Sequence, residues 1–443
     1  MAVPPTSSIA SSGFHQGDPL ASLLFALVLH PLVLRIQVTV PTIMLNSWFH
    51  DDGTEVGTKE ELQAVVDLLV SEGPARGLHL STALTSTKPK SEVWSPICLN
   101  QEDQEDDPLH RGIPRVRGLG VTLLGAPIGY RSFIREFLKE KVEKIRLVIT
   151  LLPGLKKPHI EYCLLRSCLS IPKIAYSLRT VDTSDCKDIL QEFDGLIQES
   201  LIRIIGAPVS ARQWLQARLP TGQGGMGLRG AEETAAAAYA SSFLSAQPYI
   251  RRLRGQQLDD PPSSLPQSIL DSISFHTGDL TTKEELQGLT QKMLEIKIDK
   301  HNHAKLKDEV IQEGNPREMA RLASLSLPYA GAWLDAAPVA ALGLYMQPSE
   351  FTMAARYRLG IPVYDQAGPC PACHRPSDRL GDHSLCCGHQ GERLSCHNRL
   401  RDARHDVAAS AALGPVKEGR FLLPGQQMCL FLAGQQGETQ LLM

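Results

Sequence analysis

The sequence lacks an excess of charge of either sign and a long apolar run, and each absence excludes a class of protein. Its 45 Lys and Arg against 48 Asp and Glu give a net charge of −3, so overall charge does not direct the chain to nucleic acid. The longest apolar run, Leu20–Leu34, is interrupted by His30 and Pro31 and is shorter than the ~20 residues of a membrane span. It predicts a buried helix, and we expect no membrane partner.

The sequence also lacks a secretory signal and a disulfide framework. Its first residues, MAVPPTSSIASSG, contain no basic stretch followed by an apolar one. The ten cysteines are scattered, and four of them fall within Cys370–Cys387, which is typical of reduced thiols with one metal site. We therefore expect an intracellular protein, and 443 residues are enough for two or three domains.

The first hundred residues predict a helix, a hairpin and a second helix. Pro19 should begin the Leu20–Leu34 helix, with Asp18 as its cap. The β-branched and aromatic residues around Asp51-Asp52-Gly53 predict two strands joined by a tight turn. A capping box, formed by Thr58 and Glu61, then opens a helix that is closed by Gly73-Pro74.

The rest of the chain reads as mainly helical, which makes the fold class α+β with small hairpins. Apolar residues spaced by three or four predict helices at residues 132–152, 160–176, 186–205 and 231–245, and further helices up to about residue 325. Residues 99–115 are acidic and then turn-rich, which predicts a surface loop. Residues 254–268 are polar and proline-rich, which predicts a linker.

One stretch is locally basic. Residues 131–179 contain eleven Lys and Arg against four Glu, a charge of +7 in 49 residues. Such a stretch is either a solvated helical face or a surface that tracks a nucleic-acid backbone.

Paired aspartates at a hairpin tip suit a nucleotidyl-transfer site, because that chemistry needs carboxylates that hold two divalent ions. Asp51-Asp52-Gly53 alone is weak evidence, since Asp-Gly turns are common. The order of several motifs is more specific. The chain contains, in this order, QGDPLASLLF, WFHDDG, GLHL with PKSEVW, and LLGAPIG, followed by LLRSCLSIPKIAYSLRT and LPTGQGGMGLRGAEETAAAAYASS.

Together these motifs resemble the later palm motifs and the thumb of reverse transcriptases from non-LTR retrotransposons, over roughly residues 11 to 424. The resemblance implies an RNA-directed DNA polymerase that uses Mg²⁺ or Mn²⁺, deoxynucleotides, an RNA template and a DNA primer. It implies metal binding by Asp51 and Asp52, and a nuclear or cytoplasmic location. Nucleotide and template binding would fall to Gln16, Gly17, Asp18, Pro19 and Lys90, and LLGAPIG would be the primer-grip hairpin.

The sequence departs from that family at two places. Phe49 stands where the family has a tyrosine before the hairpin aspartates. The family also has a metal-binding aspartate on a strand upstream of Gln16, and no acidic residue precedes Gln16 here. Because two-metal catalysis depends on every carboxylate, we expect this chain not to polymerise.

A cysteine-rich module follows the helices. Cys370, Cys373, His383 and Cys387 have the spacing C-x2-C-x9-H-x3-C, in which a tight Cys pair and two later ligands can form a tetrahedral zinc site. The competing ligands are His374, Cys386 and His389. In the family, a Cys/Cys/His/Cys knuckle precedes a restriction-like endonuclease.

The end of the sequence resembles the start of that endonuclease, with Glu418 as a possible acidic residue of its site. The resemblance ends near Gly425. Back-translation of the last seventeen residues in a shifted frame permits DVFIPSWSAGRDAALD, which resembles the continuation of the family. We therefore expect a frameshift that gives the nuclease an aberrant tail.

The sequence thus falls into five predicted segments. They are a partial palm (1–130), a helical thumb (131–255), a helical linker region (256–350), a zinc knuckle (351–400) and the start of a nuclease with an aberrant tail (401–443). The alternative is a nucleic-acid-binding zinc-knuckle protein without catalysis. An unrelated Asp-dependent hydrolase has little support, because no nucleophile, base or oxyanion-hole motif accompanies the aspartates.

Overall fold

The structure of the protein is a computed structural model, and it describes residues 18–96, 111–255, 264–279, 282–388, 392–412, 430–433 and 439–442. Several predicted features lie outside these ranges. They are Gln16, Gly17, His389, Glu418, most of the acidic loop and most of the proline-rich linker.

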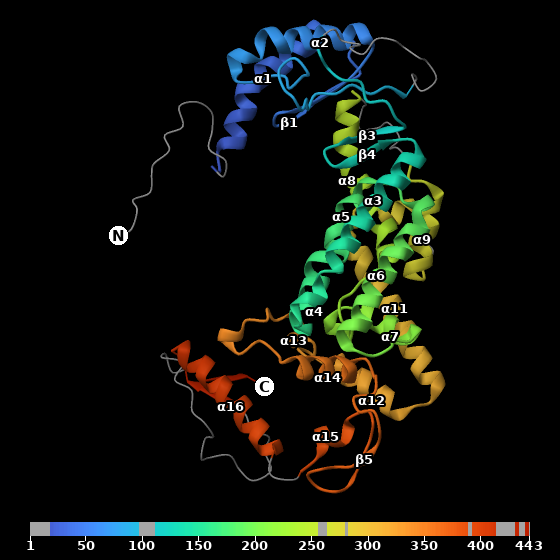
Figure 1. The fold of residues 1–443 in the computed structure, drawn as a ribbon, viewed down its shortest axis with the longest axis vertical. Coiled ribbons are helices and arrows are strands. Elements are labelled where there is room, and N and C mark those ends of the chain that lie inside the picture. The colour runs from blue at the N-terminus through green and yellow to red at the C-terminus, as the bar shows by residue number, and fades with distance from the viewer. Residues whose placement is uncertain are drawn as a thin grey trace. The chain divides into compact units, whose positions relative to one another are not determined.

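The described chain is mainly helical, with small two-stranded hairpins, as the sequence predicts (Figure 1). It forms two compact units, each assembled from separate stretches of chain. The first unit contains the chain up to Leu151, Ser167–Ile197 and Arg229–His301. The second contains Leu152–Arg166, Gln198–Leu228 and the chain from Asn302 onward.

The first half of the sequence contains the larger hairpins and the helices that follow them. The elements are α1 (Ala21–Thr39), β1 (Leu45–Phe49), β2 (Asp52–Val56), α2 (Lys59–Glu72), β3 (Gly120–Leu123), β4 (Ala126–Gly129), α3 (Arg131–Ile149), α4 (Pro158–Leu164), α5 (Ile171–Thr180) and α6 (Lys187–Ile205).

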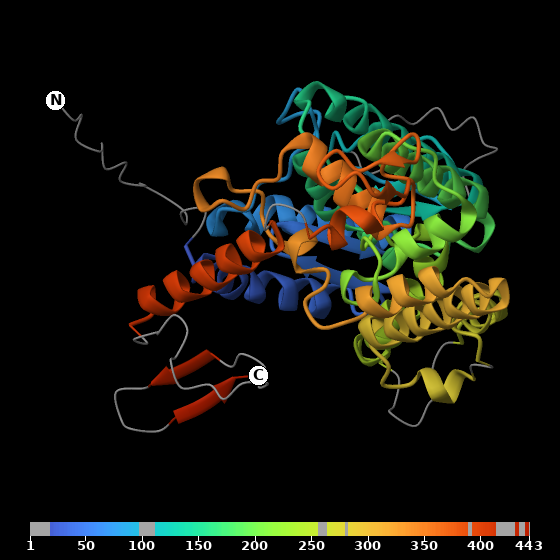
Figure 2. The same ribbon diagram turned by 90° about the horizontal axis from the view of Figure 1, so that it is seen from below.

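The second half is helical until the short strands of the cysteine-rich module. The elements are α7 (Ala211–Arg218), α8 (Ala231–Leu253), α9 (Gln267–Thr277), α10 (Lys283–Leu286), α11 (Gln291–Glu313), α12 (Pro316–Leu325), α13 (Ala332–Asp335), α14 (Pro348–Arg358), β5 (Gly368–Pro369), β6 (Pro376–Ser377), α15 (Asp382–Cys386) and α16 (Glu392–Ser410). An antiparallel hairpin, β7 (Leu430–Ala433) with β8 (Thr439–Leu442), is visible as two red arrows in Figure 2.

Helix α1 differs from the predicted buried helix in length and in burial. It begins at Ala21, continues through Pro31 and ends at Thr39. Only one face is buried, at Leu29, Leu32 and Ile36, and leucines on the other face are exposed. Among the described helices, α1 alone has the length and apolar composition of a membrane span.

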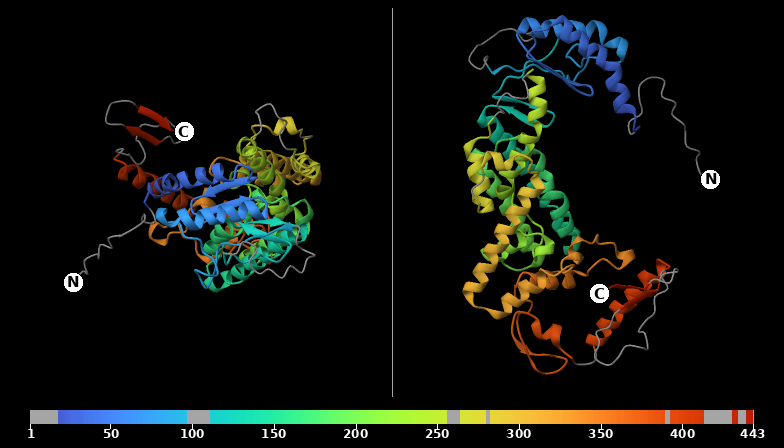
Figure 3. Two further views of the ribbon diagram at one scale, coloured as in Figure 1. Left: turned by 90° about the horizontal axis from the view of Figure 1, so that it is seen from above. Right: turned by 180° about the vertical axis from the view of Figure 1, so that it is seen from behind.

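The first core of the chain lies between α1, α2 and the β1–β2 hairpin (Figure 3). The predicted capping box at the start of α2 is confirmed, because the Thr58 hydroxyl accepts from Glu61 N–H and the Glu61 carboxylate accepts from Thr58 N–H. Val65 and Leu69 of α2 pack against Leu32 and Ile36 of α1 in one buried cluster. This packing supports the hairpin from one side.

Two predicted helices have different bounds. The helix predicted at 160–176 is divided into α4, a π-helical turn at Leu165–Leu169, and α5. Pro172 explains the division, since it lacks the N–H that a continuous helix requires. The alanine-rich helix α8 runs to Leu253 and not to residue 245, and its buried alanines pack with residues of α9 and α11 in the first unit.

Candidate metal centre and acidic pocket

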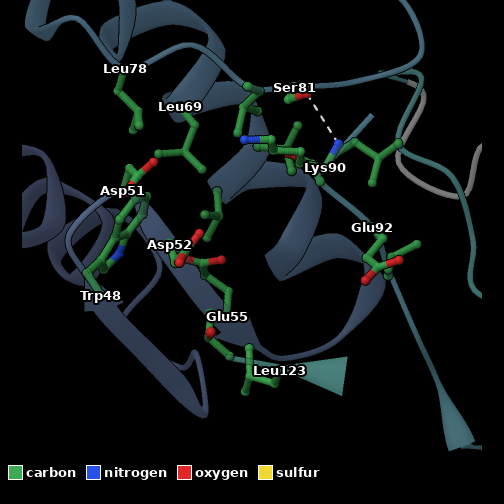
Figure 4. A pocket seen from close by; sticks show the side chains of 18 of the residues that line it. Trp48, Asp51, Asp52, Glu55, Leu69, Leu78, Ser81, Lys90, Glu92 and Leu123 are labelled. Carbon is green, nitrogen blue, oxygen red and sulfur yellow. Dashed lines mark hydrogen bonds between the residues drawn. The ribbon is translucent and has the colours of Figure 1, made fainter. Parts of the chain in front are cut away.

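A large open pocket of the first unit brings together residues from four of the motifs that the sequence analysis singled out. Asp18 comes from the first motif, Asp51 and Asp52 from the β1–β2 hairpin, Lys90 from PKSEVW, and Leu123 from the β3–β4 hairpin. In Figure 4 the hairpin residues come from one wall, and Ser81, Lys90 and Glu92 come from the segment that follows α2. Residues more than a hundred positions apart in the sequence therefore line one pocket.

The hairpin turn lies one residue earlier than predicted. Phe49 pairs with Asp52, so the turn consists of His50 and Asp51, and Asp52 is the first residue of β2. His50 has a φ of 57°, in the left-handed region that hairpin turns require. The consequence is that Asp51 occupies the tip and that both aspartates are exposed to solvent.

The two aspartates do not by themselves form a two-ion site. In the part of the chain that the structure describes, only the cysteine module brings three or more Cys, His, Asp or Glu ligand atoms together. Two adjacent carboxylates supply too few oxygens for two Mg²⁺ ions, each of which prefers six oxygen ligands. The described residues therefore fit part of a Mg²⁺ site.

Asp18 and Pro19 are the described part of the predicted Gln-Gly-Asp-Pro turn, but Asp18 is not the cap of α1, whose N-cap residue is Leu20. The Asp18 carboxylate instead accepts from Leu20 N–H at 2.8 Å in the turn before the helix, and the Asp18 carbonyl accepts from Ala21 N–H at 3.1 Å. The helix starts at Ala21, two residues after Pro19. This arrangement fixes the Asp18 carboxylate at the edge of the pocket.

Lys90 is held by its backbone, which leaves its side chain exposed. Its N–H donates to the Ser81 carbonyl at 3.0 Å and to the Ser81 hydroxyl at 3.2 Å (Figure 4). The Lys90 residue is exposed and lines the pocket. The backbone of Lys90 is thus fixed at the pocket, and its exposed side chain is available to an anion there.

The β3–β4 hairpin was predicted from LLGAPIG and is confirmed. Leu123 pairs with Ala126, and the two turn residues, Leu124 and Gly125, have φ angles of 47° and 79°. Two positive φ angles are typical of a type I′ turn, for which glycine is well suited. The Tyr176 hydroxyl donates to the Leu124 carbonyl at 2.7 Å and so fastens this turn to α5.

Glu55 is a residue of the pocket that the sequence analysis missed. It lies on the same face of the hairpin as Asn46, Trp48 and Gly53, and its Oε1 atom is buried with no hydrogen-bond partner among the residues that the structure describes. A side chain at Gly53 would place its Cβ 2.8 Å from the Trp48 ring and 2.9 Å from Glu55 Oε1. Burial raises the pKa of Glu55 to about 7. The alternation of side chains along a strand could have predicted that Glu55 lies on this face of the hairpin. It could not have predicted that the side chain is buried there.

We expect Glu55→Gln to stabilise the first unit at pH 8 by about 2 kcal/mol. Because the folded pKa lies above the ordinary 4.5, the Glu55 contribution to stability is complete below pH 4.5 and is lost as the pH rises through about 7. Urea unfolding at pH 5 and pH 8 measures this difference through Trp48 fluorescence, with the other three tryptophans replaced by phenylalanine and the exposed Glu60→Gln as control. An equal effect of the Glu55 variant at both pH values would contradict it.

The cysteine module forms a compact Cys3His cluster. The ligand atoms of Cys370, Cys373, His383 and Cys387 all lie within 4.8 Å of one another. Cys370 Sγ is 3.9 Å from Cys387 Sγ, and Cys373 Sγ is 3.2 Å from His383 Nε2. Two sulfurs bound to one tetrahedral zinc at 2.3 Å are roughly 3.8 Å apart. The cluster therefore fits a zinc ion.

The geometry selects among the competing ligands. Cys387 is buried and belongs to the cluster, whereas its neighbour Cys386 is exposed and does not. His374 has a φ of 60° in the turn after Cys373, and it is not in the cluster. The backbone N–H groups of Cys373 and Ala372 lower the pKa of the Cys370 thiol to about 6. The site thus favours a thiolate, the form that binds zinc.

Polar contacts around the cluster orient the helix that carries His383. The Asp378 carboxylate accepts from the N–H groups of Asp382 and His383, at 3.1 and 2.8 Å. Arg317 of α12 donates to both carboxylate oxygens of Asp382, at 2.6 and 3.0 Å. These contacts join α15 to the helices of the second unit, as outer contacts commonly do around a metal site.

No known protein family, curated protein or solved structure matches the chain.

Proposed function

We propose that the chain is a reverse-transcriptase fragment of a non-LTR retrotransposon, with a partial palm, a helical thumb, a zinc knuckle and the start of a restriction-like nuclease. One observation carries the proposal, namely that four ordered motifs of the family supply residues to one pocket. If the resemblance were due to chance, there would be no reason for these separated segments to line the same pocket. The family also implies an intracellular, nuclear or cytoplasmic location.

In this proposal the palm residues have distinct roles. Asp51 and Asp52 would hold Mg²⁺ or Mn²⁺, the ions that in an active polymerase of the family would activate a primer hydroxyl and stabilise the leaving pyrophosphate. The exposed ammonium of Lys90 would bind the triphosphate, and Gln16, Gly17, Asp18 and Pro19 would shape the nucleotide and template pocket. Glu418 would be a residue of the nuclease remnant.

The proposed fragment binds a primer–template but does not extend it. Two hairpin carboxylates are too few to hold two ions in place, and each ion contributes several kcal/mol of transition-state stabilisation. The Cys3His cluster favours the second candidate function, a nucleic-acid-binding protein without catalysis, because small zinc modules commonly bind nucleic acid. Both candidate functions predict that the protein binds nucleic acid without catalysis. They differ only in whether the chain derives from a reverse transcriptase.

We expect purified protein to bind an RNA–DNA primer–template with an affinity that falls with salt, and to incorporate no deoxynucleotide in Mg²⁺. Fluorescence anisotropy measures the first property, and gel analysis of a labelled primer measures the second. Asp51→Asn should leave both results unchanged. Absence of binding at low salt would overturn the proposal. Mg²⁺-dependent extension that Asp51→Asn abolishes would show instead that the chain is an active polymerase.

A further inference from the structure

The basic stretch 131–179 carries less free charge than its sequence suggests. Five of its eleven cations have carboxylate partners, which are the pairs Arg131–Asp185, Arg135–Asp188, Lys144–Glu140, Arg146–Glu192 and Arg166–Asp335. Three of these partners, Asp185, Asp188 and Glu192, belong to the segment around the start of α6, outside the stretch itself. The attraction for an anion must therefore come from the remaining cations, which are five lysines and Arg179, whose guanidinium donates to the neutral amide of Gln291.

Lys141 of α3 and Lys173 of α5 are two such lysines, and neither has a carboxylate partner among the described residues. Lys141 Nζ donates to the Ser177 hydroxyl at 2.8 Å and lies 6.0 Å from the centre of the Phe137 ring. Lys173 precedes Ser177 by one turn on α5, and its side chain is exposed. The Lys141 ammonium is thus held beside α5 where α3 and α5 meet, and the exposed Lys173 lies one turn before Ser177 on α5.

This arrangement costs energy when no anion is present. Burial, and then the charge of Lys173, lower the pKa of Lys141. The Ser177 hydroxyl, with the Phe137 ring nearby, holds the Lys141 ammonium in place, whereas the exposed Lys173 side chain has no hydrogen-bond partner among the described residues. An anion between the two ammonium groups would remove the repulsion and would meet one ammonium group that is already ordered.

Resting on the proposed function, we infer that Lys141 and Lys173 together bind one phosphodiester group of a nucleic-acid backbone, and that Ser177 positions Lys141. A phosphodiester has two unbridged oxygens that share one negative charge, so each ammonium can donate to one of them. Lysines bind phosphate as point charges, without reading base sequence. The contact therefore contributes affinity and salt dependence, with no preference for sequence.

The test measures binding of the full chain to a labelled RNA–DNA duplex at several salt concentrations. The double variant Lys141→Gln/Lys173→Gln should reduce the slope of log K against log salt by about one, the loss of one phosphate contact. Its affinity should fall about tenfold at low salt. The matched control is Lys144→Gln on the same helix, because Lys144 is exposed and already paired with Glu140. Ser177→Ala should weaken binding less than the double variant, since both charges remain.

Four outcomes are distinguishable. A reduced slope in the double variant alone, with an unchanged circular-dichroism melting curve, supports the inference. A duplex bound equally by wild type and double variant overturns it and leaves the proposed function intact. Duplex binding that inorganic phosphate displaces at millimolar concentration would make this a free-phosphate site and would also overturn it. If the wild-type chain binds no duplex at low salt, both the inference and the proposed function fail.

Discussion

Replacement of Cys370 by serine is expected to remove zinc from the protein. Cys370 is buried and supplies one of four ligand atoms that lie within 4.8 Å of one another. A serine hydroxyl is a poor zinc ligand at neutral pH, whereas the pKa of the Cys370 thiol is lowered to about 6 by backbone N–H groups. Binding energies of structural zinc sites are ~10–16 kcal/mol, so the loss of one thiolate is a large change.

The measurement is metal content after purification, together with the absorption of the Co²⁺-substituted protein, whose thiolate bands report tetrahedral sulfur ligands. We expect about one zinc per wild-type chain and almost none in Cys370→Ser. Cys386→Ser is the matched control, because Cys386 is the exposed neighbour of a ligand and lies outside the cluster. Equal zinc loss in both variants would contradict the ligand set that the geometry selects.

Zinc removal should also loosen the contact between the cysteine module and α12 within the second unit. The helix α15 carries His383 and is joined to α12 by the two hydrogen bonds between Arg317 and Asp382. Arg317 also lies 5.9 Å from the centre of the Tyr357 ring, on α14. We expect chelation to increase amide exchange in α15, since a metal site that orders its own loop contributes to folding.

Local patterns in the sequence predict local structure well in this chain. The capping box of Thr58 and Glu61 fixes the start of α2, because both partners are three residues apart on one turn. Short sequence spacing also predicts the turn at Leu124-Gly125 and the ligands of the cysteine module. In each of these cases the interacting groups are close in sequence, so spacing is enough.

Features that depend on distant neighbours could not be predicted in this way. The spacing favours Cys387 but leaves its neighbour Cys386 as a competing ligand, and the two residues are separated by their burial. The net charge of the basic stretch overstated its free charge, because Asp188 and Glu192 come from another helix. The burial of Glu55 depends on the packing around the hairpin. Tertiary contact decides each of these properties, and no local pattern encodes it.

Arg358 is the strongest case of such a distant contact, because its side chain is only 2% exposed and it joins segments far apart in the sequence. Its guanidinium donates to the carbonyls of Thr221, Gly225 and Ala330, at 2.6, 2.9 and 3.1 Å. Burial lowers the pKa of Arg358 to about 10, so the group remains charged at neutral pH.

The loop that contains Thr221 and Gly225 is closely folded, so its carbonyl groups cannot easily form other hydrogen bonds if Arg358 is replaced. A side chain at Gly225 would place its Cβ 1.9 Å from the Leu219 carbonyl oxygen, so the backbone is closely folded there. The Arg358 carbonyl in turn accepts from Gln216 at 2.8 Å and from Arg321, whose guanidinium also pairs with Glu318. Removal of the guanidinium therefore leaves several buried polar groups without partners.

We expect Arg358→Met to lower the free energy of unfolding of the second unit by about 4 kcal/mol, since each buried acceptor left unsatisfied costs ~1–3 kcal/mol. The matched control is Arg356→Met on the same helix. Arg356 donates to the carbonyls of Ile205 and Gly206, at 2.8 and 2.6 Å, but it is only partly buried. Water can replace its contacts, and the expected loss is about 1 kcal/mol.

Urea unfolding measured by the fluorescence of Trp333 tests this difference, because Trp333 packs edge-on against Phe351 of α14 at 5.8 Å. The other three tryptophans are replaced by phenylalanine in every variant, so that the signal reports the second unit alone. An equal loss of unfolding free energy in the two variants would contradict this prediction. It would mean that water reaches the carbonyls around residue 358 after the substitution and replaces the lost hydrogen bonds. A much larger loss for Arg358→Met would show that one buried cation, bonded to backbone carbonyls alone, holds the glycine-rich loop to α14.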